Sequence, residues 1–225
     1  PWGLFGRMIA AQGAGFGGYV TAGRWVICSA SPELFFARHG PLLVSRPMKG
    51  TVGRGRWYEE DRAQAEWLRQ SEKNRAENLM IVDMVRNDMG RLAAVGSVTV
   101  PRLFALEPYP TLWQMTSTVQ GVTDAGLAAV FSALFPAASI TGAPKIRTME
   151  IIADLESAPR RIYTGTVGFV APDGRAQFNV AIRTVLVDRE TAMAEFGVGG
   201  GVVWDSEEVS EFAECRVKAR VLSHV

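Results

Sequence analysis

Strand-like and helical segments occur in separate runs along this chain. Four strand-like segments follow one another over residues 16–48, divided by the turns TAGR and RHGP, and residues 58–92 read as two successive helices rich in strong helix formers. Further strands are expected at 96–106 and 113–121, and further helix at 125–157. Strands that occur in runs pair antiparallel, so this order predicts an α+β fold with antiparallel sheets rather than a β-α-β alternation.

The remaining segments extend the same pattern. We expect a hairpin of residues 163–170 and 176–187 around PDGR, then a turn at DRET into a strand over 192–204, and a terminal helix over 206–222. The chain contains no internal repeat. A length of 225 residues with 48% hydrophobic residues suits one sizeable domain, so we expect residues 1–225 to form a single domain.

Composition excludes several classes of function. The net charge is +1 and no stripe of lysine and arginine occurs, which argues against nucleic-acid binding. Cys28 and Cys215 match no metal or redox spacing, and so few cysteines fit a reducing compartment, which we expect to be the cytoplasm. No apolar run reaches membrane-spanning length. The chain starts at Pro1 without a methionine or a charged signal region, so we expect part of a longer protein.

Two glycine-rich motifs are similar to dinucleotide-binding motifs but lack the structure that must follow them. GAGFGG (13–18) and GVGGG (197–201) are both followed by strand-like residues instead of the helix that such a motif requires. Glycines in a strand instead let a ligand or another backbone approach closely. The only histidines are His39 and His224, which makes histidine-based zinc chemistry and a Ser-His-Asp triad improbable.

The segment SRPMKGT (45–51) places a lysine after a strand. Pro47 cannot donate to a sheet ladder and Gly50 relaxes the backbone, so Lys49 is expected where a strand ends and the chain turns. Taken alone, a lysine in such a place is a solvated surface charge.

Two helices carry carboxylates. The terminal helix places Glu211, Glu214 and Lys218 on one face, and the helix at 75–88 carries Glu77, with Asn74 one turn earlier. If these helices converge, their oxygen ligands suit Mg²⁺, whereas either helix alone reads as a solvated face.

Anion-binding features are also present. In SITGAPK (139–145), Thr141 is expected to cap a helix with Pro144 in its first turn, and Lys145 adds positive charge to a helix N-terminus that attracts anions. Arg183, within an apolar strand, requires a carboxylate partner from the protein or from a ligand, and Tyr163 could share that anion. An ordinary capped helix and ordinary packing explain these residues equally well.

Together these segments resemble the chorismate-utilising enzymes, the family of the anthranilate, aminodeoxychorismate, isochorismate and salicylate synthases. The similar blocks span residues 29 to 222 and are SPELF, RPMKGT, NRAENLMIVDMVRNDMGR, FPAASITGAPKIRTMEII, YTGTVGFV, AIRT, GVGGGVVWDS and SEFAECRVKAR. The resemblance implies an antiparallel α/β sandwich, of which this chain would be the C-terminal, chorismate-binding portion. It also implies a glutaminase partner that supplies ammonia.

The resemblance assigns roles to individual residues. Lysine in the motif around Lys49, where anthranilate synthases have alanine, is typical of the enzymes that form 4-amino-4-deoxychorismate for p-aminobenzoate and folate. It implies Lys49 as nucleophile and Glu33 as general acid/base. The amine must be neutral to attack, which burial, Mg²⁺ and Arg46 would have to favour. The metal is implied to be Mg²⁺ on Glu77, Glu211 and Glu214. The implied substrate-binding residues are Thr51, Tyr163, Arg183, Gly199, Gly200 and Lys218.

Two positions depart from the family pattern, and other functions stay open. Asn74 replaces a glutamate of many relatives, which weakens it as a metal ligand, and Gln114 replaces a histidine of anthranilate synthases while it can still donate a hydrogen bond. The alternatives are an anthranilate synthase and a non-catalytic fragment that binds only chorismate or the glutaminase. Isochorismate or salicylate synthesis is disfavoured, since it needs a lysine base upstream of this chain.

Overall fold

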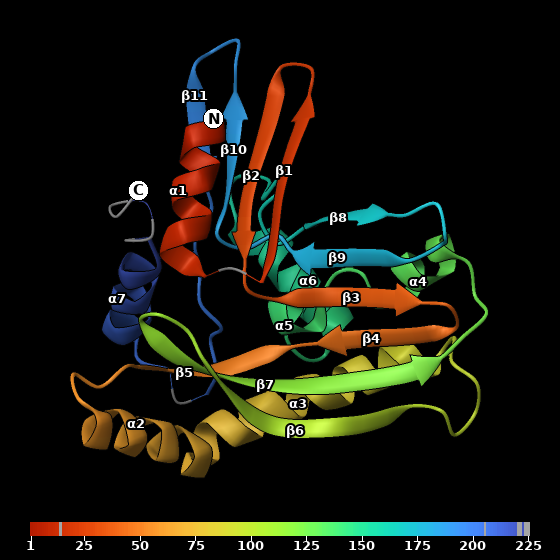
Figure 1. Ribbon diagram of the computed structural model, residues 1–225, viewed down its shortest axis with the longest axis horizontal. Coiled ribbons are helices and arrows are strands. Elements are labelled where there is room, and N and C mark those ends of the chain that lie inside the picture. Colours follow the sequence, from red (N-terminus) through yellow and green to blue (C-terminus); the bar gives the residue numbers. More distant parts are fainter. Residues whose placement is uncertain (14, 205, 220–221, 223–225) are drawn as a thin grey trace. The chain divides into compact units, whose positions relative to one another are not determined.

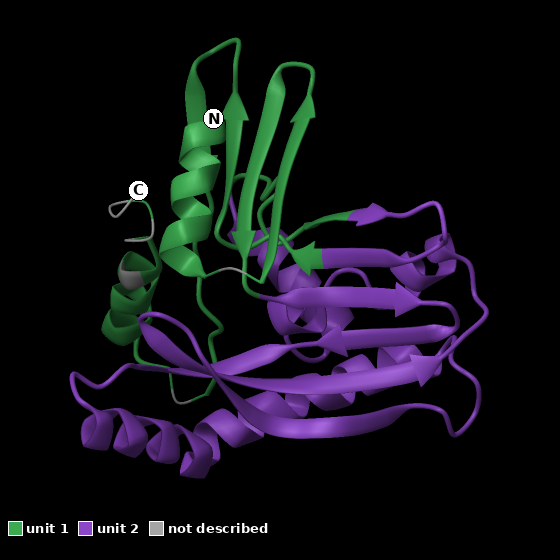
Figure 2. Ribbon diagram, viewed as in Figure 1, with its two compact units in different colours: residues 1–32, 158–168, 179–225 green, residues 33–157, 169–178 purple. Residues whose placement is uncertain are grey.

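The computed structural model describes residues 1–13, 15–204, 206–219 and 222 (Figure 1). The chain divides into two compact units (Figure 2). Unit 1 comprises residues 1–32, 158–168 and 179–225, and unit 2 comprises residues 33–157 and 169–178. His224 and the part of the expected terminal helix at residues 220–221 lie outside the described residues.

Unit 1 is built on a four-stranded antiparallel sheet with the order β1-β2-β10-β11. Its elements are α1 (Trp2–Gln12), β1 (Phe16–Ala22), β2 (Trp25–Ser31), β10 (Thr184–Asp188), β11 (Met193–Phe196) and α7 (Glu208–Ala219). Helix α1 lies along this sheet (Figure 1), because Met8 and its apolar neighbours pack on Val26, Cys28 and Val185. The helix ends at Gly13, whose left-handed backbone lets its N–H bond the carbonyl of Ile9.

Unit 2 carries most of a second sheet and five helices. The order of this sheet is β5-β7-β4-β3-β9-β8, with β6 beside β7. Its elements are β3 (Leu34–His39), β4 (Leu42–Arg46), β5 (Met48–Gly53), α2 (Tyr58–Gln70), α3 (Glu72–Gly90), β6 (Thr99–Pro108), β7 (Leu112–Val122), α4 (Leu127–Leu134), α5 (Ala138–Thr141) and α6 (Lys145–Leu155). The boundary between the units falls inside β8 (Thr166–Val170) and β9 (Ala176–Val180).

Strand β7 organises the part of unit 2 that carries Lys49. Strand β6 pairs along one edge of β7, and β4 and then β5 pair along the other. Pro47 interrupts that second edge, where its carbonyl still accepts from the Ser117 N–H at 3.1 Å. Helix α3 packs against β5 and β7.

The buried face of α3 differs from the apolar stripe that the sequence suggests. The apolar residues Leu79, Val82, Met84 and Val85 suggest one stripe along this helix, but Leu79 is 43% exposed. The helix instead buries Asn78, Ile81, Val82 and Val85, at i, i+3, i+4 and i+7. A polar residue therefore occupies the buried face at the level of Lys49.

Most of the expected elements are confirmed, and so is the α+β class with antiparallel sheets. Two details are wrong. The expected strand over 176–187 is two strands that belong to different sheets, divided at 181–183, and residues 197–203 form no strand. Among the described residues, no single helix has the length and composition to cross a membrane, and only the bent pair Leu127–Thr141 and Lys145–Leu155 passes that test together.

Candidate active site

Lys49 lies in a β-bulge and not at the end of a strand. The register between β5 and β7 joins Met48 to Thr116 and Thr51 to Gln114. Two residues of β5, Lys49 and Gly50, therefore face one residue of β7. Bulges redirect side chains, and the expected turn after Lys49 is wrong because the chain continues along β7.

The bulge requires a glycine at position 50. Its φ angle is +97°, which disfavours any side chain. A Cβ there would also lie 3.1 Å from the Cβ of Asn74. Asn74 itself binds Ser71 at the start of α3, through its amide nitrogen at 2.8 Å.

The amine of Lys49 is held by a carboxylate. Its Nζ lies 2.8 Å from Oε1 of Glu77 on α3, and each side chain is only 18% exposed. The guanidinium of the nearby strand residue Arg46 pairs with Glu107 at 3.4 Å. The expectation that Arg46 favours the neutral lysine stays a prediction.

Glu33 is the second acid beside Lys49. It directly precedes β3 and is 4% exposed. Burial raises the pKa of Glu33 to about 7, against smaller opposing effects of a hydrogen bond from Ser139, the charge of Lys49 and the backbone of Met48. A carboxyl group with that pKa can hold or release a proton near neutral pH, which is what a general acid/base requires.

Thr51 and Gln114 bind one another beside the bulge. The Thr51 hydroxyl donates to Oε1 of Gln114 at 3.0 Å, and Nε2 of Gln114 donates to the carbonyl of Gly50 at 2.9 Å. The expected ability of Gln114 to donate is thus confirmed, with the protein backbone as acceptor. Asn78 and Ser139 also contact this region. They lie in the segments NRAENLMIVDMVRNDMGR and SITGAPK, but neither residue was assigned a role from the sequence.

In unit 1, the glycine-rich segment lies against Tyr163. A Cβ at Gly197 would be 2.2 Å from the Tyr163 ring, and one at Gly199 would be 2.8 Å from its hydroxyl. The glycines therefore allow the close approach of a tyrosine. Tyr163 lies in a turn before β8, not at the start of a strand.

Helix α7 brings two predicted residues, Glu211 and Lys218, to the same glycine-rich segment. Lys218 donates to the carbonyl of Gly199 at 2.9 Å and pairs with Glu214 at 2.7 Å. Glu211 accepts from the Ser206 hydroxyl at 2.6 Å, and its Oε2 would be 3.0 Å from a Cβ at Gly200. The expected single face of this helix is thus a face that contacts the protein's own backbone.

Arg183 lies between β9 and β10 with a left-handed backbone, φ +49°. Its guanidinium binds the side-chain oxygen of Gln12 at the end of α1. The neighbouring Ala181 exchanges backbone hydrogen bonds with Thr164 and Gly165, at 2.9 and 2.8 Å, so this segment and the turn of Tyr163 are directly joined. Left-handed non-glycine residues cluster at functional sites, and both Thr164 and Arg183 are of this kind.

The SITGAPK segment does not act as expected. Thr141 lies in α5 and donates to Gly142 rather than capping α6, which begins at Lys145. Lys145 pairs with Asp88 at 2.6 Å and donates to the carbonyls of Leu134 and Pro136. This lysine therefore joins α3 to the α4–α5 connection, and its charge is paired with Asp88.

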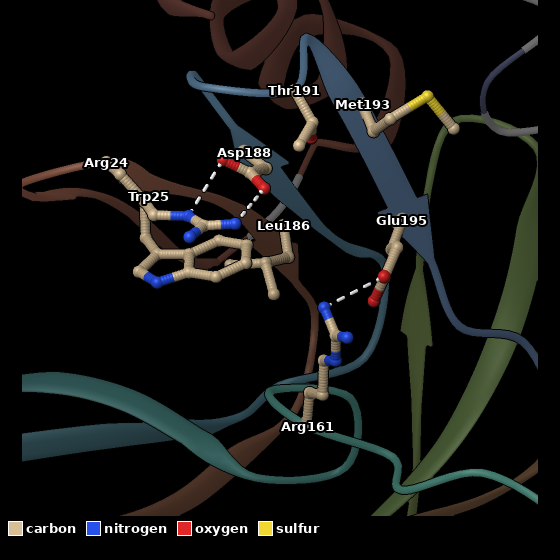
Figure 3. Close-up of a pocket in the computed structure, with 8 residues that line it drawn as sticks. All are labelled: Arg24, Trp25, Arg161, Leu186, Asp188, Thr191, Met193 and Glu195. Atoms are coloured by element: carbon tan, nitrogen blue, oxygen red, sulfur yellow. Dashed lines mark hydrogen bonds and ion pairs between the residues drawn. The ribbon is translucent and has the colours of Figure 1, made fainter.

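Unit 1 contains a cavity of about 340 Å³ (Figure 3), and none of the predicted site residues lines it. Arg24 binds Asp188 through two bonds of 3.0 and 2.6 Å and lowers the pKa of Asp188 to about 2, and Arg161 pairs with Glu195 at 2.9 Å. Arg24 also lies over the Trp25 ring at 4.7 Å. Because each charge has an opposite neighbour, the cavity offers no ready site for a dianion. Its lining consists of Arg24, Trp25, Arg161, Leu186, Asp188, Thr191, Met193 and Glu195.

The carboxylates fit a hard cation in their chemistry. Glu77, Glu211 and Glu214 offer oxygen donors only, which Mg²⁺ prefers. Within the described part of the chain, no three acidic, histidine or cysteine side chains gather into a metal site. Glu77 belongs to unit 2 and the other two belong to unit 1, so the shared site stays a prediction.

An antiparallel α+β fold thus carries a largely buried lysine with two carboxylates beside it, a set of groups that acid–base and covalent catalysis use. Residues 1–224 match the family model described as chorismate binding enzyme, and the chain belongs to that family. It is 42% identical over 226 residues to an aminodeoxychorismate synthase of Streptomyces griseus, covering 99% of this chain and 31% of the relative. It is 40% identical to aminodeoxychorismate synthase component 1 of Salmonella typhimurium, covering 99% of this chain and 49% of that relative.

Solved structures agree with this fold. An anthranilate synthase component I from Streptococcus pneumoniae is 29% identical with a TM-score of 0.89, covering 99% of this chain and 49% of that one. The fold is shared by a menaquinone-specific isochorismate synthase from Escherichia coli, which is 21% identical with a TM-score of 0.83. That match covers 97% of this chain and 51% of the other. The chain thus spans about half or less of the length of these four proteins.

Proposed function

We propose that residues 1–225 are the C-terminal, chorismate-binding portion of an enzyme that aminates chorismate to 4-amino-4-deoxychorismate. One observation carries this proposal: the amine of Lys49 lies 2.8 Å from Glu77 and beside Glu33, a buried carboxyl group whose pKa is about 7. The names of the relatives from Streptomyces griseus and Salmonella typhimurium support the same activity.

In the proposed reaction, Lys49 is the nucleophile and Glu33 the general acid. The nitrogen of Lys49, after losing a proton, forms a bond to C2 of chorismate while both ring double bonds shift, from C1=C2 to C1=C6 and from C5=C6 to C4=C5, and the C4–O bond breaks. The C4 hydroxyl leaves as water with a proton from Glu33. Ammonia then forms a bond at C4, both double bonds shift back, the C2–N bond to Lys49 breaks, and the proton released by the new amine passes to the departing lysine nitrogen. Two such allylic displacements restore the configuration at C4.

Mg²⁺ would be held by Glu77 and Glu214, with Glu211 nearby, and would neutralise the ring carboxylate of the substrate. Tyr163, Arg183 and the backbone of Gly199 and Gly200 would bind the enolpyruvyl carboxylate, with Lys218 at the same anion site and Thr51 beside Lys49. Supporting this grouping, Tyr163, Gly199 and Lys218 already lie around one another within unit 1.

We further infer a glutaminase partner as the source of ammonia. The Salmonella relative is named component 1, a name that implies a second component. A cytoplasmic location stays a prediction, because relatives from Oryza sativa and Arabidopsis thaliana are named chloroplastic.

Anthranilate synthesis is the second candidate, because the similarity to the Streptococcus pneumoniae anthranilate synthase extends over nearly the whole chain. Lysine at position 49 disfavours it, since a nucleophilic amine there gives an adduct on which ammonia replaces the lysine. A non-catalytic fragment is the third candidate, because the chain spans at most half of its relatives.

Incubation with chorismate, ammonium and Mg²⁺, followed by chromatographic separation of the products, decides among these three. The proposal predicts aminodeoxychorismate. Anthranilate as the product, or no product, would support the second or third candidate. Lys49→Ala should reduce amination at least about a thousandfold, as loss of the nucleophile does in other covalent enzymes, with little change in chorismate binding.

A further inference from the structure

The backbone of the Lys49 bulge is held by two amide side chains. A bulge takes one residue out of the regular ladder and would let the strand shift locally. Here the carbonyl of Lys49 accepts from Nδ2 of Asn78 at 3.2 Å, and the carbonyl of Gly50 accepts from Nε2 of Gln114 at 2.9 Å. Successive carbonyls of the bulge are thus each bound by a different side chain.

Asn78 connects both strands of the bulge to helix α3. Besides Lys49 it donates to the carbonyl of Met115, the residue opposite the bulge, at 3.4 Å. Its Oδ1 accepts from the Ser117 hydroxyl at 2.5 Å. Because one oxygen accepts and one nitrogen donates, the orientation of this amide is fixed. Asn78 is 1% exposed, so water does not compete for these bonds.

Gln114 fixes the other side of the bulge. Its oxygen accepts from Thr51 at 3.0 Å while its nitrogen binds Gly50, and the side chain is 6% exposed. Glu77, the neighbour of Asn78 on α3, holds the amine of Lys49 itself. Two consecutive residues of one helix therefore hold the backbone and the side chain of the same lysine.

We propose that Asn78 and Gln114 are positioning residues: they form an amide clamp that fixes the Lys49–Gly50 bulge and so sets the direction in which the amine of Lys49 attacks. The inference rests on the proposed function for what the amine does. Neither amide touches the reacting atoms in this scheme. Each acts through Lys49. A remote substitution that misplaces a reacting group by about 1 Å can lower the rate about a hundredfold.

The test uses Gln114→Met, which keeps the size of the side chain and removes its donor, and Asn78→Asp, which keeps the shape and the acceptor. For the full chain with Mg²⁺ and saturating chorismate, the single-turnover rate of the Lys49 adduct is measured by quenched-flow mass spectrometry. We expect each variant to lose about tenfold or more in this rate, with KM for chorismate within about threefold.

Two controls separate positioning from general destabilisation. Asn179→Asp removes a donor from another buried amide, which binds Phe16 and Ser29, and should lower stability while the adduct rate stays unchanged. Gln70→Ala shortens an exposed glutamine and should change stability and the adduct rate little. Backbone hydrogen exchange of residues 48–53 should accelerate in Gln114→Met and Asn78→Asp only.

The outcomes are distinct. If the wild-type chain forms adduct and both folded clamp variants form it at the same rate, the clamp is overturned and the proposed function stands. Unchanged hydrogen exchange at residues 48–53 would also overturn the clamp, whatever the activity. If the wild-type chain forms neither adduct nor aminated product, the proposed function fails, and the positioning role fails with it.

Discussion

Replacing Glu33 by glutamine should change how stability depends on pH. Burial raises the pKa of Glu33 from 4.5 to about 7 in the folded protein. Between these values the folded chain keeps a proton that the unfolded chain has lost, so the free energy of unfolding falls as pH rises. The stability contribution is complete below about pH 4.5 and is lost as pH approaches about 7.

The size of the effect follows from the same shift. At about 1.4 kcal/mol for each pKa unit, the difference between 4.5 and about 7 corresponds to about 3 kcal/mol. Glutamine keeps the shape of the side chain but carries no charge at any pH. The stability of Glu33→Gln relative to wild type should therefore rise by up to about 3 kcal/mol between about pH 5 and about pH 8.

Urea unfolding of both proteins across this pH range measures the difference. The exposed Glu208 supplies a matched control, because Glu208→Gln makes the same substitution at a residue that is not buried. A constant difference between Glu33→Gln and wild type would refute the reasoning. So would a carboxyl resonance of Glu33 that titrates near its ordinary value in isotope-edited NMR.

Two further substitutions test other contacts. Lys145→Met should reduce the free energy of unfolding by about 3 kcal/mol or more, because it leaves the nearly buried Asp88 without its cation; urea unfolding with no loss would contradict the structural role of Lys145. Gly197→Ala should lower stability by about 1–3 kcal/mol and raise KM for chorismate, because the added methyl overlaps the Tyr163 ring. Its control is Gly90→Ala in α3, where an added Cβ would have no neighbouring atom within 4 Å. Helix propensity predicts that this control raises the free energy of unfolding by up to about 1 kcal/mol.

Local patterns in the sequence predict most of the elements. Helix formers in runs identified α2 and α3, and β-branched segments with turn residues identified β2, β3 and β4. Helix α1 had no such signal, because Gly3 and Gly6 weaken its propensity and its stability comes from contact with the sheet. The division of the 176–187 segment depends on the left-handed backbone of Arg183, which its apolar neighbours do not reveal.

The candidate site was predictable only in part. Motifs identified Lys49, Glu33 and Glu77, and unit 2 brings these three together. The partner of Lys145 lies 57 residues away along the chain, so no local pattern could reveal it. Asn78 left one usable signal: it is a polar residue that shares a helical face with Ile81, Val82 and Val85. A polar side chain on a buried face requires hydrogen-bond partners, which here include the bulge.

The most direct test of the account is to locate the covalent bond on Lys49. After a rapid acid quench of the chain with chorismate and Mg²⁺ in the absence of ammonia, peptide mass spectrometry should find chorismate minus one water on the peptide that contains Lys49. The adduct should disappear when ammonium is added, as aminodeoxychorismate accumulates. Aminated product formed at the wild-type rate by Lys49→Ala, with no modified lysine in the wild-type chain, would contradict the account.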